Sequence, residues 1–158
     1  MSEPAGDELP TYTARVAAIL AILSEHVIVD GLVQNNRLAN PIEPLACLSA
    51  SWGTDVAAPP ILAVSIHAVD DFAAEVEELR YGGDLTQGTY EAPRAEADEF
   101  ALVQPQLSSV WVVVGQCEVY LAHRDHSPDQ LIDAAVEIAR TVGCAPYADN
   151  YEPRPEPR

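Results

Sequence analysis

The chain has 158 residues, a formal net charge of -17 and an apolar fraction of 48 %. This length fits one domain, and the apolar fraction is that of a globular protein rather than of an acidic disordered chain. The negative charge repels phosphate backbones and anionic lipid headgroups, so we expect no direct nucleic-acid binding and no membrane partner. All 8 basic residues are arginines, and this bias together with the acidity indicates a GC-rich or halophilic host.

The first ten residues contain acidic side chains and no basic one. They therefore lack the positive start of a secretory signal peptide, and we expect a flexible N-terminus over 1–10 in a protein that is cytoplasmic at synthesis. Three widely spaced cysteines, Cys47, Cys117 and Cys144, form no CxxC pair. Their spacing favours buried thiols, but whether they include a disulfide stays open.

The first expected helix covers Tyr12–Glu25, because its apolar residues recur at helical spacing and form one stripe. The β-branched run Val27–Val29 then predicts a short strand that Asp30-Gly31 ends. Residues 34–60 are rich in asparagine, proline and glycine. They predict turns, apart from a short buried piece over Leu45–Ala50.

Ile61–Val69 predicts a strong strand. Both of its faces are largely apolar, which is typical of a strand that is covered on both sides or central in its sheet. Whether 72–80 is helix or strand stays open, although Phe72, Val76 and Leu79 fit two turns of a helix that Tyr81-Gly82-Gly83 would end.

The acidic stretch 84–105 predicts a long loop or arm. Its alternatives are a solvated surface and a projecting arm that docks on a neighbouring subunit or a basic partner. Tyr81, Tyr90 and Phe100 alternate with the charges and would anchor such an arm.

The next segment, Ser109–Ala122, has the best strand pattern in the chain. Gly115 interrupts it, so a long bent strand and a tight hairpin are both possible.

The closing helix is predicted over Pro128–Val142. It begins at a capping box, Ser127 to Gln130, with proline at its first position. Arg140 lies in its last turn, and Gly143 suits a left-handed C-cap. The proline-rich segment 146–158 predicts an extended tail.

These elements predict an α+β fold, in which a small antiparallel or mixed sheet packs against an N-terminal and a C-terminal amphipathic helix. One domain over 11–145 would include the long acidic loop 84–105. The expected core comprises Val16, Ile19, Leu23, Leu62, Val64, Ile66, Val113, Val119, Ile132, Val136 and Ala139.

Catalytic motifs are weak. His123, Asp125 and His126 could ligate a divalent metal and support a small metal-dependent enzyme, but a solvated turn explains them better. A pairing of Cys47 with His67 would be needed for a thiol nucleophile, and no GxSxG elbow or phosphate loop is present. We therefore predict no enzyme, with no catalytic, cofactor-binding or metal-binding residues.

Four segments in order, Tyr12–Leu23, Val27–Gly31, Pro60–Ile66 and Val119–Ile132, form a pattern that resembles the tail-terminator and tail-completion proteins of tailed viruses. In that family an N-terminal helix precedes a small sheet, and a final strand leads into a helix begun by an acid-rich turn. The resemblance implies a non-enzymatic subunit of the head–tail junction that forms a homo-oligomeric ring, a hexamer, beside neighbouring tail or neck proteins in the virion.

A different hypothesis rests on charge alone. An acidic inhibitory protein of the immunity type would cover a basic toxin or nuclease surface, and a charge of -17 would accelerate its association with such a partner.

Overall fold

The computed structural model describes residues 12–35, 46–84 and 88–144, so the predictions for 1–10 and for the tail 146–158 lie outside the described residues. The described elements form one 7-stranded antiparallel sheet in the order β1-β2-β3-β7-β6-β5-β4. In chain order they are α1 (Tyr12–Leu23), β1 (Val33–Gln34), β2 (Ala46–Gly53), β3 (Leu62–Ala68), α2 (Phe72–Asp84), β4 (Tyr90–Ala92), β5 (Glu99–Gln104), a 3-10 turn (Pro105–Leu107), β6 (Ser109–Val114), β7 (Cys117–His123) and α3 (Pro128–Thr141).

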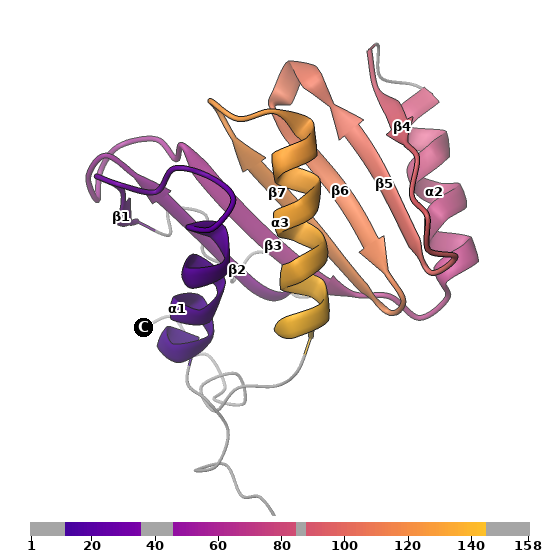
Figure 1. Cartoon of the computed structure of the whole chain (residues 1–158), viewed down its shortest axis with the longest axis horizontal. Coiled ribbons are helices and arrows are strands. Elements are labelled where there is room, and N and C mark those ends of the chain that lie inside the picture. The colour runs from indigo at the N-terminus through magenta and orange to yellow at the C-terminus, as the bar shows by residue number, and fades with distance from the viewer. Residues whose placement is uncertain (1–11, 36–45, 85–87, 145–158) are drawn as a thin grey trace, which may run out of the picture.

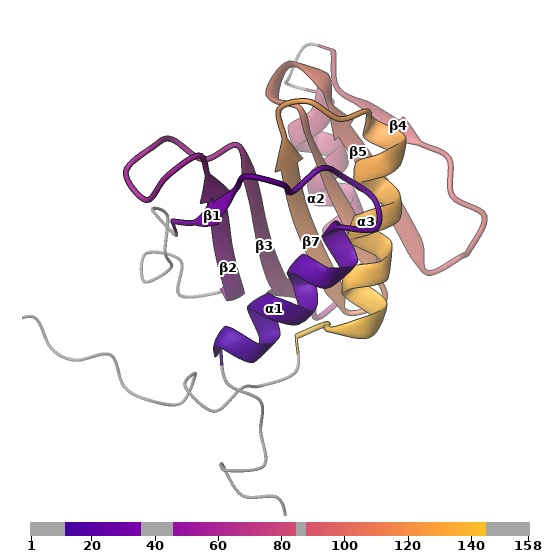
Figure 2. The ribbon, with the colours of Figure 1, turned by 60° about the vertical axis from the view of Figure 1, so that its left-hand side comes forward.

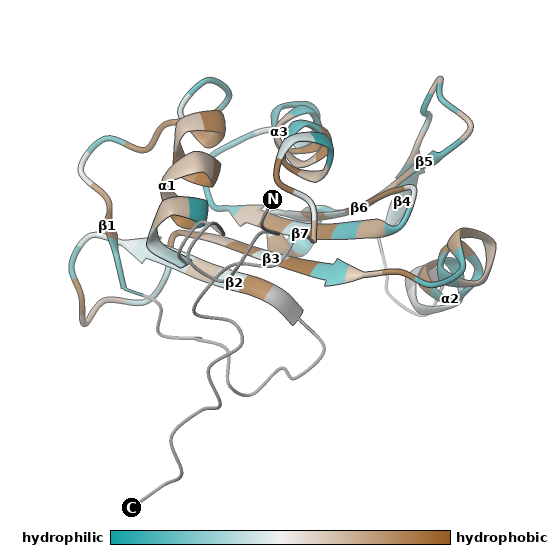
Figure 3. Cartoon of the chain, turned by 90° about the horizontal axis from the view of Figure 1, so that it is seen from below, coloured by the Kyte–Doolittle hydropathy of each residue, from teal (hydrophilic) through white to brown (hydrophobic). Residues whose placement is uncertain are grey.

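The sheet carries helices on both faces (Figure 1). Figure 3 shows α1 and α3 side by side on one face, whereas α2 lies on the opposite face at the β4–β5 end. In Figure 2, α1 lies in front of β3, and α3, beside α1, packs against β6 and β7. The α+β class with helices from both ends of the chain is therefore confirmed, and α2 is an addition.

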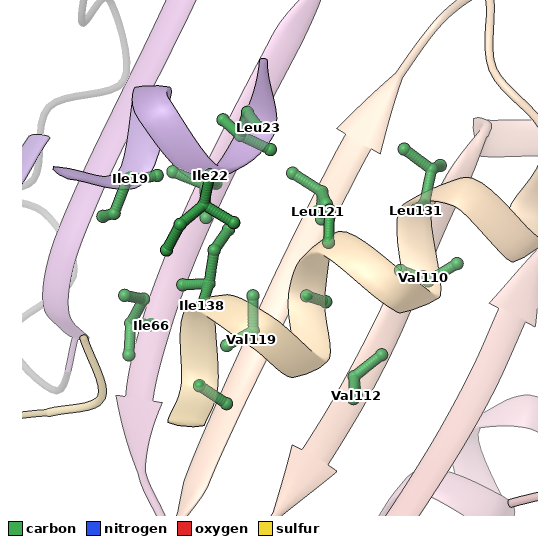
Figure 4. Packing of buried hydrophobic residues seen from close by; sticks show 14 of the residues in the cluster. Ile19, Ile22, Leu23, Ile66, Val110, Val112, Val119, Leu121, Leu131 and Ile138 are labelled. Carbon is green, nitrogen blue, oxygen red and sulfur yellow. The ribbon is translucent and has the colours of Figure 1, made fainter. Parts of the chain in front are cut away.

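The main core lies between the sheet and the pair α1 and α3 (Figure 4). Helical stripes and alternate strand positions meet there, which is what a two-layer arrangement requires. Ten of the eleven predicted core residues are buried, and Val136 is half-buried. Val113 belongs to a second, smaller cluster beneath α2, which also contains Val69, Val76, Phe100 and Leu102.

β3 is a central strand, as predicted, because it pairs with β2 on one side and with β7 on the other. Its residues alternate between buried and half-buried along the strand. Leu62, Val64 and Ile66 face α1 and α3, whereas Ala63 and Ser65 lie on the opposite face.

The strand predicted over Val27–Val29 is wrong. The N–H of Val27 donates to the oxygen of Leu23 at 2.8 Å, so the chain closes the end of α1 and does not pair with a strand. Val27 is buried, but the side chain of Ile28 is 63 % exposed. Of the short buried piece predicted at Leu45–Ala50, residues 46–50 belong to the 8-residue strand β2, with Leu48 and Ala50 buried, whereas Leu45 lies outside the described residues.

The loop predicted over 84–105 is also wrong, because it contains β4 and the whole of β5. Residues 99–104 pair with β6 along their full length, and Phe100 to Val103 are buried. Arg140 of α3 and Arg94 both bind Glu99, at 2.7 and 2.9 Å. Arg140 first and Arg94 second hold the pKa of Glu99 below its ordinary value. Arg140 of α3 and Arg94 of the preceding loop thus neutralise Glu99, the acidic residue of β5, in a stretch for which the sequence left a solvated surface and a projecting arm open.

The two open alternatives are resolved. Residues 109–123 form a tight hairpin whose turn is Gly115-Gln116, with Gly115 at a φ of +59 in the first turn position of a II′ turn. The ambiguous stretch 72–80 is helix. The N–H of Ala74 donates to Asp71 Oδ1 at 3.2 Å, and the helix runs to Asp84, beyond its expected end at Tyr81–Gly83.

α3 is built as predicted. Ser127 accepts from the backbone of Gln130, and the Gln130 side chain accepts from the backbone of Ser127, which completes the capping box. Gly143 has a φ of +59 and donates to the oxygen of Ile138 at 3.1 Å, beyond the last helical turn.

Candidate functional site

Two histidines fasten the β7–α3 turn to the segment after α1. His123 Nε2 donates to the oxygen of Ile28 at 3.0 Å, and its Nδ1 accepts from the N–H of Asp125 at 3.2 Å. His126 Nε2 accepts from the N–H of Ile28 at 2.9 Å, and its Nδ1 donates to Gln130 Oε1 at 3.0 Å. Both rings are therefore neutral, with one donating and one accepting nitrogen each.

This arrangement explains the His123-to-His126 cluster without chemistry. A metal ligand must offer the lone pair of a ring nitrogen, and here both lone pairs already accept backbone N–H groups. The two rings also lie edge to face, with centroids 4.4 Å apart. The structure thus gives this turn the role of a clamp on Ile28, and the backbone polar groups of Ile28 bond to the clamp instead of to a strand.

A different group of donor atoms meets between α1 and α3. Ligand atoms of Glu25, His26 and Glu137 lie within 4.8 Å of one another, and no other such group occurs among the described residues. His26 Nε2 already lies 2.8 Å from Glu137 Oε1, and Glu25 is exposed. The group is a hydrogen-bonded pair, His26 with Glu137, beside the exposed carboxylate of Glu25.

The clamp predicts a loss of stability in acid. Burial, chiefly, lowers the pKa of His123 below its ordinary 6.5. The imidazole of His123 then binds a proton more readily in the unfolded chain than in the folded one. The stability that neutral His123 contributes is therefore complete above about pH 6.5 and is lost as pH falls through its lower folded-state pKa. We expect a loss on the order of 1 kcal/mol between pH 7.5 and 5, measured by urea unfolding.

His123→Gln should lower stability at pH 7.5 and flatten this pH dependence, because glutamine does not titrate. Ile28→Ala serves as the control, because it keeps the backbone groups that the clamp binds and removes an exposed side chain, and it should keep the wild-type dependence. An unchanged dependence in His123→Gln would contradict the clamp as its origin.

The most perturbed ionisable group is Glu118, which the sequence analysis did not single out. It lies on β7, on the face that α2 covers, with Val113 and His67 as its partners on the two neighbouring strands. Its side chain is only 5 % exposed. Burial first, and then a hydrogen bond with Glu75 of α2 and the charges of Glu75 and Glu78, raise the pKa of Glu118 to about 9. At neutral pH Glu118 is therefore protonated and its O–H donates to the Glu75 carboxylate.

This hydrogen bond between two carboxyl groups connects α2 to the sheet at neutral pH, where two such groups on a protein surface would both be ionised. A carboxylic acid that keeps its proton at pH 7 has the property of a general acid. The described structure places Glu75 and Glu78 close to it. One sequence signal could have found it: a glutamate near the start of a strand whose other residues are apolar or aromatic.

The cysteines are distributed unevenly over the fold. Cys117 begins β7 and Cys144 follows α3, and their sulfur atoms lie 3.9 Å apart as thiols. Both border an open cavity of about 360 Å³, which Ala68, Val69, Asp70 and Gln116 also line. The side chain of Cys47 lies outside the described residues, so its pairing with His67 stays a prediction.

The outer side of α2 is strongly acidic. Four exposed carboxylates lie on this helix and just before it, and we call them the acidic α2 face: Asp70, Asp71, Glu77 and Glu78. Arg80, the arginine of the helix, is bonded to Glu77 at 3.3 Å and to Glu91 of β4 at 2.6 Å. Its charge is therefore already matched within the molecule.

Comparison of the chain with known protein families, with curated proteins and with solved structures finds no match. Within the described residues, no helix combines the length and apolarity that a membrane crossing needs.

Proposed function

We propose that the chain is a non-enzymatic interaction subunit that binds a positively charged protein through the acidic α2 face. The observation that carries the proposal is the one-sided charge of that face, where four exposed carboxylates stand beside an arginine already bonded to Glu77 and Glu91. Complementary charge of this kind accelerates association and selects basic partners.

The total charge bears on the choice of partner. A second copy of the chain also carries -17, so contact between copies is opposed by repulsion unless salt screens it. A basic partner is attracted under the same conditions. The acidic inhibitor hypothesis therefore fits the charge better than self-assembly does at low salt.

The second candidate is a ring-forming tail-terminator or neck component of a tailed virus. The order of elements favours it, because an N-terminal helix precedes the sheet and β7 leads directly into the capped helix α3. Its partners would be further copies of the chain and adjacent tail or neck proteins, and its final location would be the virion.

Molar mass measured by light scattering separates the two candidates. We expect a monomer or small oligomer at about 50 mM salt and at about 1 M salt. A discrete ring-sized oligomer at either salt concentration would overturn the first candidate in favour of the second.

The acidic α2 face is tested with an arginine-rich peptide as the probe. Fluorescence anisotropy should show binding at about 50 mM salt that weakens at least tenfold at about 500 mM. Glu77→Gln with Glu78→Gln should weaken it at low salt. The matched control, Glu25→Gln with Asp133→Asn, removes the same net charge on the α1–α3 side and should keep most of the affinity. Equal losses in both double variants would show that only net charge matters and would contradict a docking face.

A further inference from the structure

We propose that Cys117 and Cys144 form a thiol–disulfide exchange site that accepts a cationic low-molecular-weight disulfide and closes to a reversible intramolecular disulfide. This inference goes beyond the interaction function proposed above, with which it shares one residue, Asp70. It rests on two thiols in contact, on their unequal exposure, and on the charge of the cavity that they border.

The two sulfur atoms are already neighbours in the folded chain. Their separation of 3.9 Å is a van der Waals contact, whereas a disulfide bond measures about 2.05 Å. Each cysteine lies within two residues of a glycine with positive φ, Gly115 in the hairpin turn and Gly143 after α3. These turns lie at the ends of β7 and α3, so the sulfur atoms can approach without moving the centre of either element.

Exposure assigns the order of the two cysteines. Cys144 is half-buried, whereas Cys117 is only 7 % exposed. The more accessible thiol meets an incoming disulfide first, because exchange requires direct attack on a sulfur atom. Cys117 then lies in reach of the sulfur of Cys144.

The chemistry balances without a further reactant. The Cys144 thiolate attacks one sulfur of a small disulfide, whose S–S bond breaks as the mixed disulfide forms and one small thiolate leaves. The Cys117 thiolate then attacks the Cys144 sulfur and expels the second small thiolate. The protein loses two electrons and two protons, the protons pass to the released thiolates, and the small disulfide is reduced.

The cavity indicates which disulfide fits. Its volume is about 360 Å³, and its polar lining comprises the carboxylate of Asp70 and the amide of Gln116. Neither group is cationic, and the molecule carries -17. A disulfide with ammonium groups is attracted to this lining, whereas one with several carboxylates is repelled.

The experiment compares three disulfides on the full-length chain: cystamine, which is cationic, hydroxyethyl disulfide, which is neutral, and glutathione disulfide, which is anionic. We expect the rate of thiol loss to fall in that order, with cystamine at least tenfold faster than glutathione disulfide at low salt. Peptide mass mapping should find Cys117 joined to Cys144, and reductant should restore both thiols. A stable mixed disulfide in the wild type, or bridging that involves Cys47, would overturn the proposal.

Variants assign the individual roles. Cys117→Ser should stop the reaction at a mixed disulfide on Cys144, whereas Cys144→Ser should slow modification of Cys117 at least tenfold. Asp70→Asn should reduce the difference in the rate of thiol loss between cystamine and glutathione disulfide. Asp71→Asn is its matched control, since Asp71 is adjacent but does not line the cavity, and asparagine also caps helices. An equal effect of both substitutions would contradict recognition by the cavity.

Discussion

Replacing Ile66 by alanine should lower the free energy of unfolding by about 2 to 5 kcal/mol. Ile66 has no exposed surface, and its strand β3 is held between β2 and β7. Its side chain belongs to the main core that α1 and α3 cover, as the sticks in Figure 4 show. The neighbouring side chains belong to α1, α3 and the sheet, so they cannot move fully into the space that alanine leaves. The cost of the remaining cavity therefore adds to the transfer free energy lost with the side-chain atoms.

Urea unfolding followed by circular dichroism measures this loss. Ile28→Ala is the matched control, because the same side chain is 63 % exposed there and its removal should change stability by about 0.5 kcal/mol or less. A loss below about 1 kcal/mol for Ile66→Ala would mean that the core can repack around β3.

Periodic patterns predicted most of this fold. The apolar run that contains Leu62 to Ile66 and the apolar stripe of α3 are patterns of residues within a few positions of one another, so the sequence reveals them directly. The capping box at Ser127 is equally local. These elements, and the core that they imply, are confirmed.

The errors concern groups whose partners lie far along the chain. β5 seemed too acidic to be a strand, but Glu99 is held by Arg140, 41 positions later. Val27–Val29 has strand propensity, yet His123 and His126 occupy the N–H and C=O of Ile28. Local propensity is a weak guide wherever such long-range contacts decide the conformation.

The candidate sites also differ in whether their residues are close together in the sequence. The sequence singled out His123, Asp125 and His126, and the structure brings them together as a clamp with occupied ring nitrogens. The sequence offered no reason to pair Cys117 with Cys144, because 27 positions separate them. Glu118 was overlooked because its perturbation comes from burial under a helix that the sequence left ambiguous.

Glu118→Gln should stabilise the protein at pH 7.5 by about 1 to 3 kcal/mol. The pKa of Glu118 is raised from 4.5 to about 9, mainly by burial, so the folded chain keeps a proton that the unfolded chain releases. The stability that this group contributes is complete below about pH 4.5 and is lost as pH rises toward 9. Glutamine keeps a donor for Glu75 but has no proton to lose, so the variant avoids this loss.

The test is the pH dependence of unfolding between pH 5 and 9 in wild type and Glu118→Gln. The advantage of the variant should grow as pH rises, and an infrared band of a protonated carboxyl at pH 7 should disappear with the substitution. Glu96→Gln, at an exposed glutamate that does not contribute to the raised pKa, is the matched control and should leave both the pH dependence and the band unchanged. If Glu118→Gln had the same pH dependence as wild type between pH 5 and 9, Glu118 would be ionised in the folded state, which would contradict the protonated carboxyl.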